Sequence, residues 1–209
     1  MYNNLYNEEK VLKVLFEESN KEFHIRLLAR LTGLHPNTII NITDKLSENN
    51  LITKNKNKDN GLVIVKANTK NPLYKLKKQF YNIRKIYESK VIEFLNDKLN
   101  YPIIILFGSY AKAENHKDSD IDLFVICTEK KELKLEKYES VLNAEIQLFL
   151  HTQEEFKKLQ KKSPELINNV LNGYKLAGYL EVFSELQKFH KRGKSNRRRK
   201  RQAKGKSTG

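Results

Sequence analysis

The chain has 209 residues, 39% of them hydrophobic, and a formal net charge of +15 at pH 7, which permits one full domain and a smaller one with separate cores. No apolar run approaches the ~20 residues of a membrane helix, residues 1–9 lack the basic and apolar stretches of a secretion signal, and the single cysteine, Cys127, excludes an internal disulfide. We therefore expect a cytoplasmic protein without a membrane partner, in which Cys127 is a small buried apolar residue.

Three helices are predicted at the amino-terminal end. Apolar residues at helical spacing predict the first helix over residues 5–18. The second is expected over residues 23–31 and ends at Gly33, because glycine readily takes the left-handed conformation that closes a helix. The third is expected over residues 36–48, with a proline in its first turn.

A β-hairpin is predicted next, because two apolar runs, residues 51–55 and 62–66, flank the turn dipeptide Asn60-Gly61. Three helices followed by a hairpin resemble the winged helix-turn-helix domains of bacterial and archaeal transcription regulators. We assign residues 1–71 to such an α+β domain, with the third helix in the major groove of DNA. The expected nucleic-acid contacts are Asn37, Thr38, Asn41, Lys45, Lys54, Lys56 and Lys58. Recognition of RNA and contacts with proteins are the alternatives.

Residues 72–100 are predicted to form one long basic connecting helix after Asn71. Its apolar residues recur at intervals of three and four, so they form a stripe that needs a partner. Packing of this stripe on the following domain is expected, and formation of a homodimer is the alternative. The stripe comprises Leu76, Phe80, Ile83, Tyr87, Val91, Phe94 and Leu95.

Two short motifs after this helix indicate a nucleotide site. An apolar strand breaks at Gly108, where the missing Cβ lets the backbone approach a bulky anion, and Ser109 opens a helix whose free N–H groups attract phosphate. Asp120 and Asp122 then lie on one face of a second apolar strand, because strand side chains alternate. Paired carboxylates hold Mg²⁺ while phosphates complete its shell. An ordinary turn and a structural pair of aspartates are the alternatives.

In this order and spacing, the two motifs resemble the signature of the DNA polymerase β-like nucleotidyltransferase superfamily, over about residues 100–183. The likeness is closest to the minimal nucleotidyltransferases of archaea and bacteria. It implies an α/β domain with a mixed sheet, which we assign to residues 101–187. It also implies transfer of a nucleoside monophosphate from ATP or another nucleoside triphosphate to a hydroxyl acceptor, with Mg²⁺ or Mn²⁺ as the cofactor.

The resemblance implies a third carboxylate on a neighbouring strand, for which Glu145 is the candidate. Asp120, Asp122 and Glu145 are then the catalytic and metal-binding residues. If the family position falls on Gln147 instead, the third acid is missing and catalysis is in doubt. Gly108 and Ser109 are expected to hold the triphosphate, with Lys112 or Lys117 as an additional cation.

The acceptor has no recognisable signature, so RNA ends, proteins, antibiotics and small metabolites stay open. Some minimal nucleotidyltransferases modify a small helical toxin partner, and the regulator-like amino-terminal domain suits autoregulation of such an antitoxin-type pair. The alternative is a transcription regulator whose nucleotidyltransferase-like domain binds a nucleotide without transfer. A third interpretation is an RNA-modifying enzyme.

The carboxyl-terminal end is predicted to contain helices over residues 154–160, 164–172 and 174–189. Residues 188–209 carry eleven Lys or Arg and no acid, so eleven of the fifteen net positive charges lie there. We expect a disordered basic tail, which either attracts phosphate backbones or only increases solubility.

Overall fold

A computed structural model describes residues 2–57 and 61–180, and residues 1–178 form one compact unit. Lys58, the predicted basic tail and most of the predicted helix over residues 174–189 lie outside the described residues. Among the helices of the described ranges, none has the length and apolar character needed to cross a membrane.

The amino-terminal part contains the three predicted helices and the hairpin, and one strand that the sequence did not indicate. The strand order in its sheet is β1-β3-β2, and both pairings are antiparallel. His24 and Gly33 bound the second helix: the His24 ring accepts a hydrogen bond from Leu27 N, and Gly33 has φ +69°. The elements are α1 (Tyr2–Glu17), β1 (Glu22–His24), α2 (Ile25–Thr32), α3 (Pro36–Glu48), β2 (Ile52–Lys56) and β3 (Val63–Ala67).

The connecting segment is two helices and not one, α4 (Pro72–Glu88) and α5 (Val91–Leu99). The break falls at Lys90, whose φ of +69° no α-helix accommodates. Val91 and Leu95 are buried, as the stripe predicts. Leu76 and Phe80 are 59% and 67% exposed, so the expectation that α4 packs through these side chains is wrong.

Polar residues form most of the face that α4 buries. This face consists of Tyr74, Lys78, Asn82 and Ile86. The polar members are buried because backbone carbonyls and hydroxyl groups of other segments satisfy them. Apolar periodicity therefore predicted the wrong buried side at Leu76 and Phe80, whereas Ile83 packs against the core as the stripe predicts.

The carboxyl-terminal part is a mixed α/β structure around a four-stranded sheet with the order β6-β5-β4-β7. β5 and β6 are parallel, whereas β4 pairs antiparallel with both β5 and β7. The mixed sheet expected of this part is thus confirmed. Its strands are β4 (Ile103–Phe107), β5 (Ile121–Cys127), β6 (Ile146–Thr152) and β7 (Tyr174–Ala177). Its helices are α6 (Gly108–Lys112), α7 (Glu136–Leu142), α8 (Gln153–Lys162) and α9 (Pro164–Leu171).

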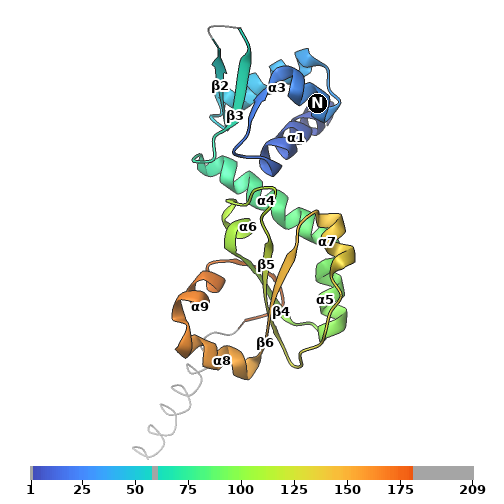
Figure 1. The fold of residues 1–209 in the computed structure, drawn as a ribbon, viewed down its shortest axis with the longest axis vertical. Helices are drawn as coiled ribbons and strands as arrows, with labels where there is room; N and C mark the ends of the chain where they lie inside the picture. The colour runs from blue at the N-terminus through green and yellow to red at the C-terminus, as the bar shows by residue number, and fades with distance from the viewer. Residues whose placement is uncertain (1, 58–60, 181–209) are drawn as a thin grey trace, which may run out of the picture. The chain divides into compact units, whose positions relative to one another are not determined.

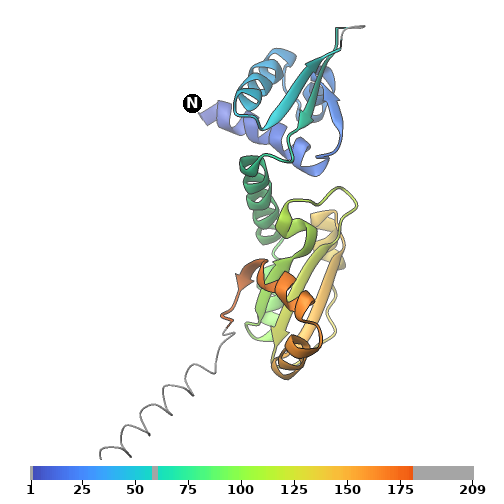
Figure 2. The same cartoon turned by 90° about the vertical axis from the view of Figure 1, so that its left-hand side faces the viewer.

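Helices cover both faces of this sheet. Figures 1 and 2 show α5 and α7 on one side and α8 and α9 on the other. On the first side, Leu95 and Leu142 pack with Leu106 and Leu123 in one core. On the second side, the rings of Phe124 and Phe156 lie 6.0 Å apart. The central strands β4 and β5 are therefore buried on both faces, whereas β6 and β7 are only partly buried.

The segment 174–177 is a strand, so the predicted helix is wrong there. β7 adds an edge to the sheet by pairing with β4, with Leu106 opposite Tyr174. A Cβ on Gly173 would lie 2.2 Å from the Leu106 carbonyl oxygen, so glycine is required where the chain turns into this strand. The pairing depends on residues about seventy positions earlier in the chain, which local sequence patterns do not report.

Candidate nucleotide and metal site

The site is built where β4 ends and the chain turns sharply. Gly108 has φ +70°, and a Cβ placed on it would lie 2.0 Å from the Asp122 Oδ2 atom. The missing side chain thus gives space to a carboxylate of the same molecule. Glycine is required here both by the left-handed backbone and by this close approach.

Asp120 immediately precedes β5, and Asp122 is the second residue of that strand. Both side chains are half-buried, and Asp122 lies directly opposite Phe107 on β4. Burial, and then the negative charge of Asp120, raises the pKa of the Asp122 carboxyl. The structure therefore brings the two predicted aspartates close enough for their charges to interact.

The neighbouring strand places Gln147 beside the aspartates. In the parallel pairing of β5 and β6, Asp122 lies opposite Gln147. The Gln147 Nε2 atom donates a hydrogen bond of 2.6 Å to Asp120 Oδ2. Of the two polar side chains that the sequence offered at this position, Gln147 makes the contact.

Glu145 immediately precedes β6 and has an exposed side chain. Its backbone carbonyl accepts a 2.8 Å hydrogen bond from Ile121 N. Within the described ranges, no three His, Cys, Asp or Glu side chains converge as a group able to hold a metal ion. The role of Glu145 as a third ligand stays a prediction.

The donors present suit a hard divalent cation. Carboxylate oxygens are the ligands that Mg²⁺ prefers, and it commonly binds through one or two carboxylates together with substrate phosphates. Burial and the Asp120 charge raise the pKa of Asp122, and a cation between the two aspartates would offset both effects. Two aspartates therefore fit a magnesium–nucleotide complex better than a closed cage made only by the protein.

Ser109 lies half-buried in α6, a helix of only five residues. So short a helix has a weak dipole, so a phosphate bound here would be held by the N–H groups of the first turn. Lys112 ends this helix with an exposed side chain. Lys117 lines a separate cavity of about 140 Å³ together with Lys85 and Tyr81, and neither aspartate borders that cavity.

The predicted nucleic-acid residues on α3 share one exposed side of the helix. Asn37, Asn41 and Lys45 are exposed, and Thr38 is half-buried. A hollow runs past most of them. It is lined by Glu8, Thr38, Asn41, Ile42, Asp44, Lys45 and Glu48. Three of these lining residues are acids, and acidic side chains oppose the approach of phosphate.

The hairpin contributes fewer free cations than the sequence suggested. Lys56 is exposed, whereas Lys54 Nζ lies 2.5 Å from Asp44 Oδ1. This ion pair joins the hairpin to α3 and neutralises one of the predicted phosphate contacts. The two residues lie ten positions apart on different elements, so local sequence patterns do not indicate this pair.

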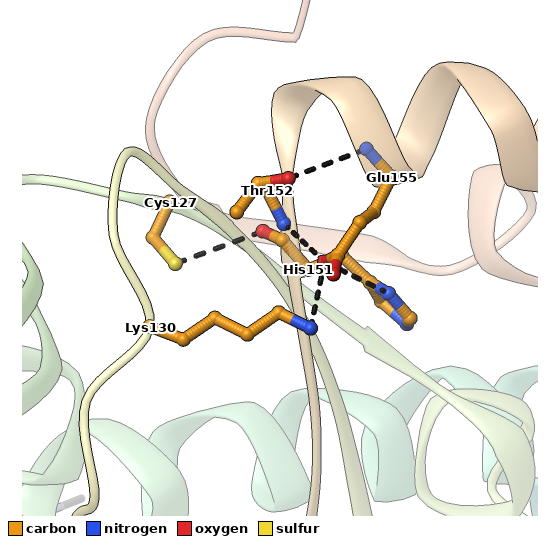
Figure 3. Close-up of polar contacts among 5 residues, drawn as sticks. All are labelled: Cys127, Lys130, His151, Thr152 and Glu155. Atoms are coloured by element: carbon orange, nitrogen blue, oxygen red, sulfur yellow. Dashed lines mark hydrogen bonds and ion pairs between the residues drawn. The ribbon is translucent and has the colours of Figure 1, made fainter.

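A second polar cluster lies at the opposite end of β5 and β6 (Figure 3). Cys127 Sγ donates to the His151 carbonyl, and burial raises the pKa of the thiol. Lys130 Nζ lies 2.7 Å from Glu155 Oε2, which also accepts from Thr152 N in a capping box at the start of α8. Cys127 is buried as expected, and a buried thiol with a raised pKa is a poor nucleophile. We therefore assign this cluster a structural role at the start of α8.

Residues 89–177 match the family model described as polymerase beta, nucleotidyltransferase. The matched segment extends from the end of α4 to β7 and includes both aspartates and Gly108. No curated protein and no solved structure matches the chain. The match supports a polymerase β-like nucleotidyltransferase domain in this segment, and nucleotidyl transfer as its general activity.

Proposed function

We propose that the chain is a magnesium-dependent nucleotidyltransferase, which transfers a nucleoside monophosphate from ATP or another nucleoside triphosphate to a hydroxyl acceptor. One observation carries this proposal: the Asp122 carboxylate lies against Gly108 and within reach of the Asp120 charge, inside the segment that matches the nucleotidyltransferase model. The same segment includes the β4–α6 turn, whose backbone would face the triphosphate.

In this reaction the acceptor oxygen attacks the α-phosphorus, the bond from that phosphorus to the bridging oxygen breaks, and pyrophosphate leaves. Bound Mg²⁺ would neutralise charge on the triphosphate. Asp120 and Asp122 would hold the cation, and the backbone at Gly108 and Ser109 would position the phosphates. Glu145 is the proposed acceptor of the hydroxyl proton, a role that needs hydrogen-bond reach in the assembled complex.

The direct test uses ATP labelled at the α-phosphate, Mg²⁺ and a cell extract. The unchanged chain should transfer label to an acceptor, and an Asp120→Ala, Asp122→Ala double variant should not. Asp118→Asn is a matched control, because Asp118 is an exposed acid in the loop before the site. Equal labelling by the unchanged chain and the double variant would reject the assigned site.

The contact between Gln147 and Asp120 favours a second candidate function, a regulator that binds a nucleotide without transfer. An amide stands where a third acid would face the aspartates, and Gln147 is engaged with Asp120 at 2.6 Å. Gln147→Glu distinguishes the candidates. A chain that binds magnesium and ATP but transfers label only after this substitution would be a binding protein that lacks one carboxylate.

We further propose that residues 1–71 are a winged helix-turn-helix domain that binds DNA. The element order, the β1-β3-β2 sheet and the exposed Asn37 and Asn41 on α3 support this assignment. Binding of duplex DNA and structured RNA, measured at one fixed salt concentration, tests it. Stronger binding of RNA would favour an RNA-modifying enzyme instead.

Two protein partners belong to the same proposal. A small helical toxin partner would serve as the hydroxyl acceptor in an antitoxin-type pair. A homodimer would cover the exposed apolar side chains of α4, Leu73, Leu76 and Phe80. Light scattering of the purified chain, alone and with the product of a neighbouring gene, tests both partners.

A further inference from the structure

Lys78, in the middle of α4, is completely buried. Burial lowers the pKa of its ammonium group to about 8. Within residues 2–57 and 61–180, no carboxylate lies within ion-pair distance of its Nζ atom. A buried ammonium group without an ion-pair partner destabilises a fold. The hydrogen bonds of Lys78 offset part of this cost and therefore explain how the lysine is tolerated there.

One of these bonds reaches the end of α1. Lys78 Nζ donates to Ser19 Oγ at 2.8 Å. Ser19 in turn donates to the Phe16 carbonyl at 3.1 Å and accepts from the Tyr74 hydroxyl at 3.1 Å. The lysine is thereby attached to the last turn of the amino-terminal helix.

The other bond reaches the loop of residues 113–120, which connects the two halves of the nucleotide site. Lys78 Nζ donates to the Asn115 carbonyl at 2.5 Å. The buried amide of Asn82, one turn further along α4, donates to Asn115 Oδ1 and to the Tyr110 carbonyl, both at 2.9 Å. Asn115 lies between Ser109 and Asp120 in the chain, so the two side chains of α4 hold the middle of this loop.

We propose that Lys78 is a positioning residue that couples the nucleotide site to the end of α1. Its two bonds fix the 113–120 loop, and through it Asp120, relative to Ser19. Any change that moves Ser19 then changes nucleotide affinity, and nucleotide binding by linkage stabilises the position of Ser19. This proposal rests on the proposed function, because the ligand is the nucleotide. The hydrogen bonds of Lys78 provide the physical connection between the two segments.

The first test needs no ligand. Hydrogen exchange is measured on the full chain as Lys78→Met, which keeps the stem and removes the ammonium, and as the control Lys77→Met on the same helix. Lys78→Met should increase exchange both in residues 15–21 and in residues 113–120, and Lys77→Met in neither. Increased exchange confined to one of the two segments, or to α4, would overturn the proposal.

The second test is a double-mutant cycle between Ser19→Ala and Lys78→Met, with the Kd for a non-hydrolysable ATP analogue and Mg²⁺ as the readout. Ser19→Ala is the milder change and keeps the cycle informative if Lys78→Met is poorly stable. We expect Ser19→Ala to weaken binding about threefold in the unchanged background and not at all beside Lys78→Met. If Lys78 had only a structural role, Lys78→Met would lower Tm, but Ser19→Ala would change the Kd equally in both backgrounds.

The outcomes separate the two proposals. If the unchanged chain binds no nucleotide, the proposed function fails, and the exchange experiment still decides whether Lys78 couples the two segments. If the chain binds the analogue and Ser19→Ala leaves the Kd unchanged, the coupling fails while the proposed function stands.

Discussion

At the scale of single residues, the site depends on Gly108 giving space to Asp122. The Asp122 carboxylate lies where a side chain at position 108 would be, and burial beside Asp120 raises its pKa. Both residues were predictable from the sequence, because a glycine at a strand end and alternating aspartates are local signals. The contact of Gln147 with Asp120 was not, since it depends on the register between β5 and β6.

Gly108→Ala should destabilise the fold and abolish nucleotide binding. The left-handed backbone alone costs an alanine about 1–2 kcal/mol, and the new Cβ would also displace the Asp122 carboxylate. Gly33→Ala is the matched control, because Gly33 has nearly the same φ and an added Cβ there would meet nothing within 4 Å. Urea unfolding and titration with an ATP analogue measure the two effects. Equal losses of stability in the two variants would contradict the close approach at Gly108.

Asp122→Asn should stabilise the metal-free fold at neutral pH. A carboxyl whose pKa is higher in the folded than in the unfolded state binds more protons when folded, so its contribution to stability falls as pH rises through that window. At pH 7 the charged group is therefore unfavourable, and an amide removes the penalty. A Tm increase of roughly 2–4 °C is expected for each kcal/mol relieved. Scanning calorimetry without metal, with Asp118→Asn as control, checks this, and an unchanged or lower Tm would count against it.

At the scale of elements, α4 differs most from its prediction. Apolar spacing along the segment predicted one helix packed through Leu76 and Phe80, whereas the structure buries Lys78 and Asn82 and exposes both apolar residues. Hydrogen bonds to distant carbonyl groups decide which face is buried, and amino-acid spacing does not report them. The apolar strands β4 and β5 were readable, because their burial follows from hydrophobicity alone.

The stability of the chain should rise with pH between about pH 8 and 9.5 because of Lys78. Its pKa is lowered from 10.5 to about 8, so the unfolded chain binds more protons in this window and folding is favoured as pH increases. The full pKa difference corresponds to about 3 kcal/mol, of which about half is gained between pH 8 and 9.5. Urea unfolding at a series of pH values should show the rise in the unchanged chain and a smaller one in Lys78→Met.

The window ends near pH 9.5, because burial raises the pKa of Tyr74 to about 12 and the opposite trend begins where unfolded tyrosine ionises. Lys77→Met serves as the control and should keep the full rise. A rise of the same size in Lys78→Met would show that other groups cause it.

At the scale of the whole molecule, the sequence predicted two parts and their order along the chain, and the mixed sheet of the second part is confirmed. The positions that differ depend on contacts between distant segments: the edge strand β7, the three-residue strand β1 and the Lys54–Asp44 pair. The total charge of +15 also gave little guidance, because eleven positive charges lie in residues 188–209.

If the amino-terminal part binds DNA, substitution of an α3 residue that contacts bases should affect DNA binding differently from substitution of one that contacts phosphates. Asn41→Ala should cost about 1–3 kcal/mol on a preferred duplex and relax sequence preference, whereas Lys45→Ala should weaken binding to all duplexes and lower the salt slope by about one. Anisotropy titrations at several salt concentrations measure both. Indifference of duplex affinity to both substitutions would remove α3 from the interface.

Isothermal titration of the full chain with Mg²⁺ and a non-hydrolysable ATP analogue shows whether the paired aspartates form a nucleotide site. We expect saturable binding near one equivalent in the unchanged chain. An Asp120→Asn, Asp122→Asn double variant whose fold is intact by circular dichroism should lose at least tenfold in affinity. The same affinity in both chains, or no heat in either, would contradict a nucleotide site at the paired aspartates.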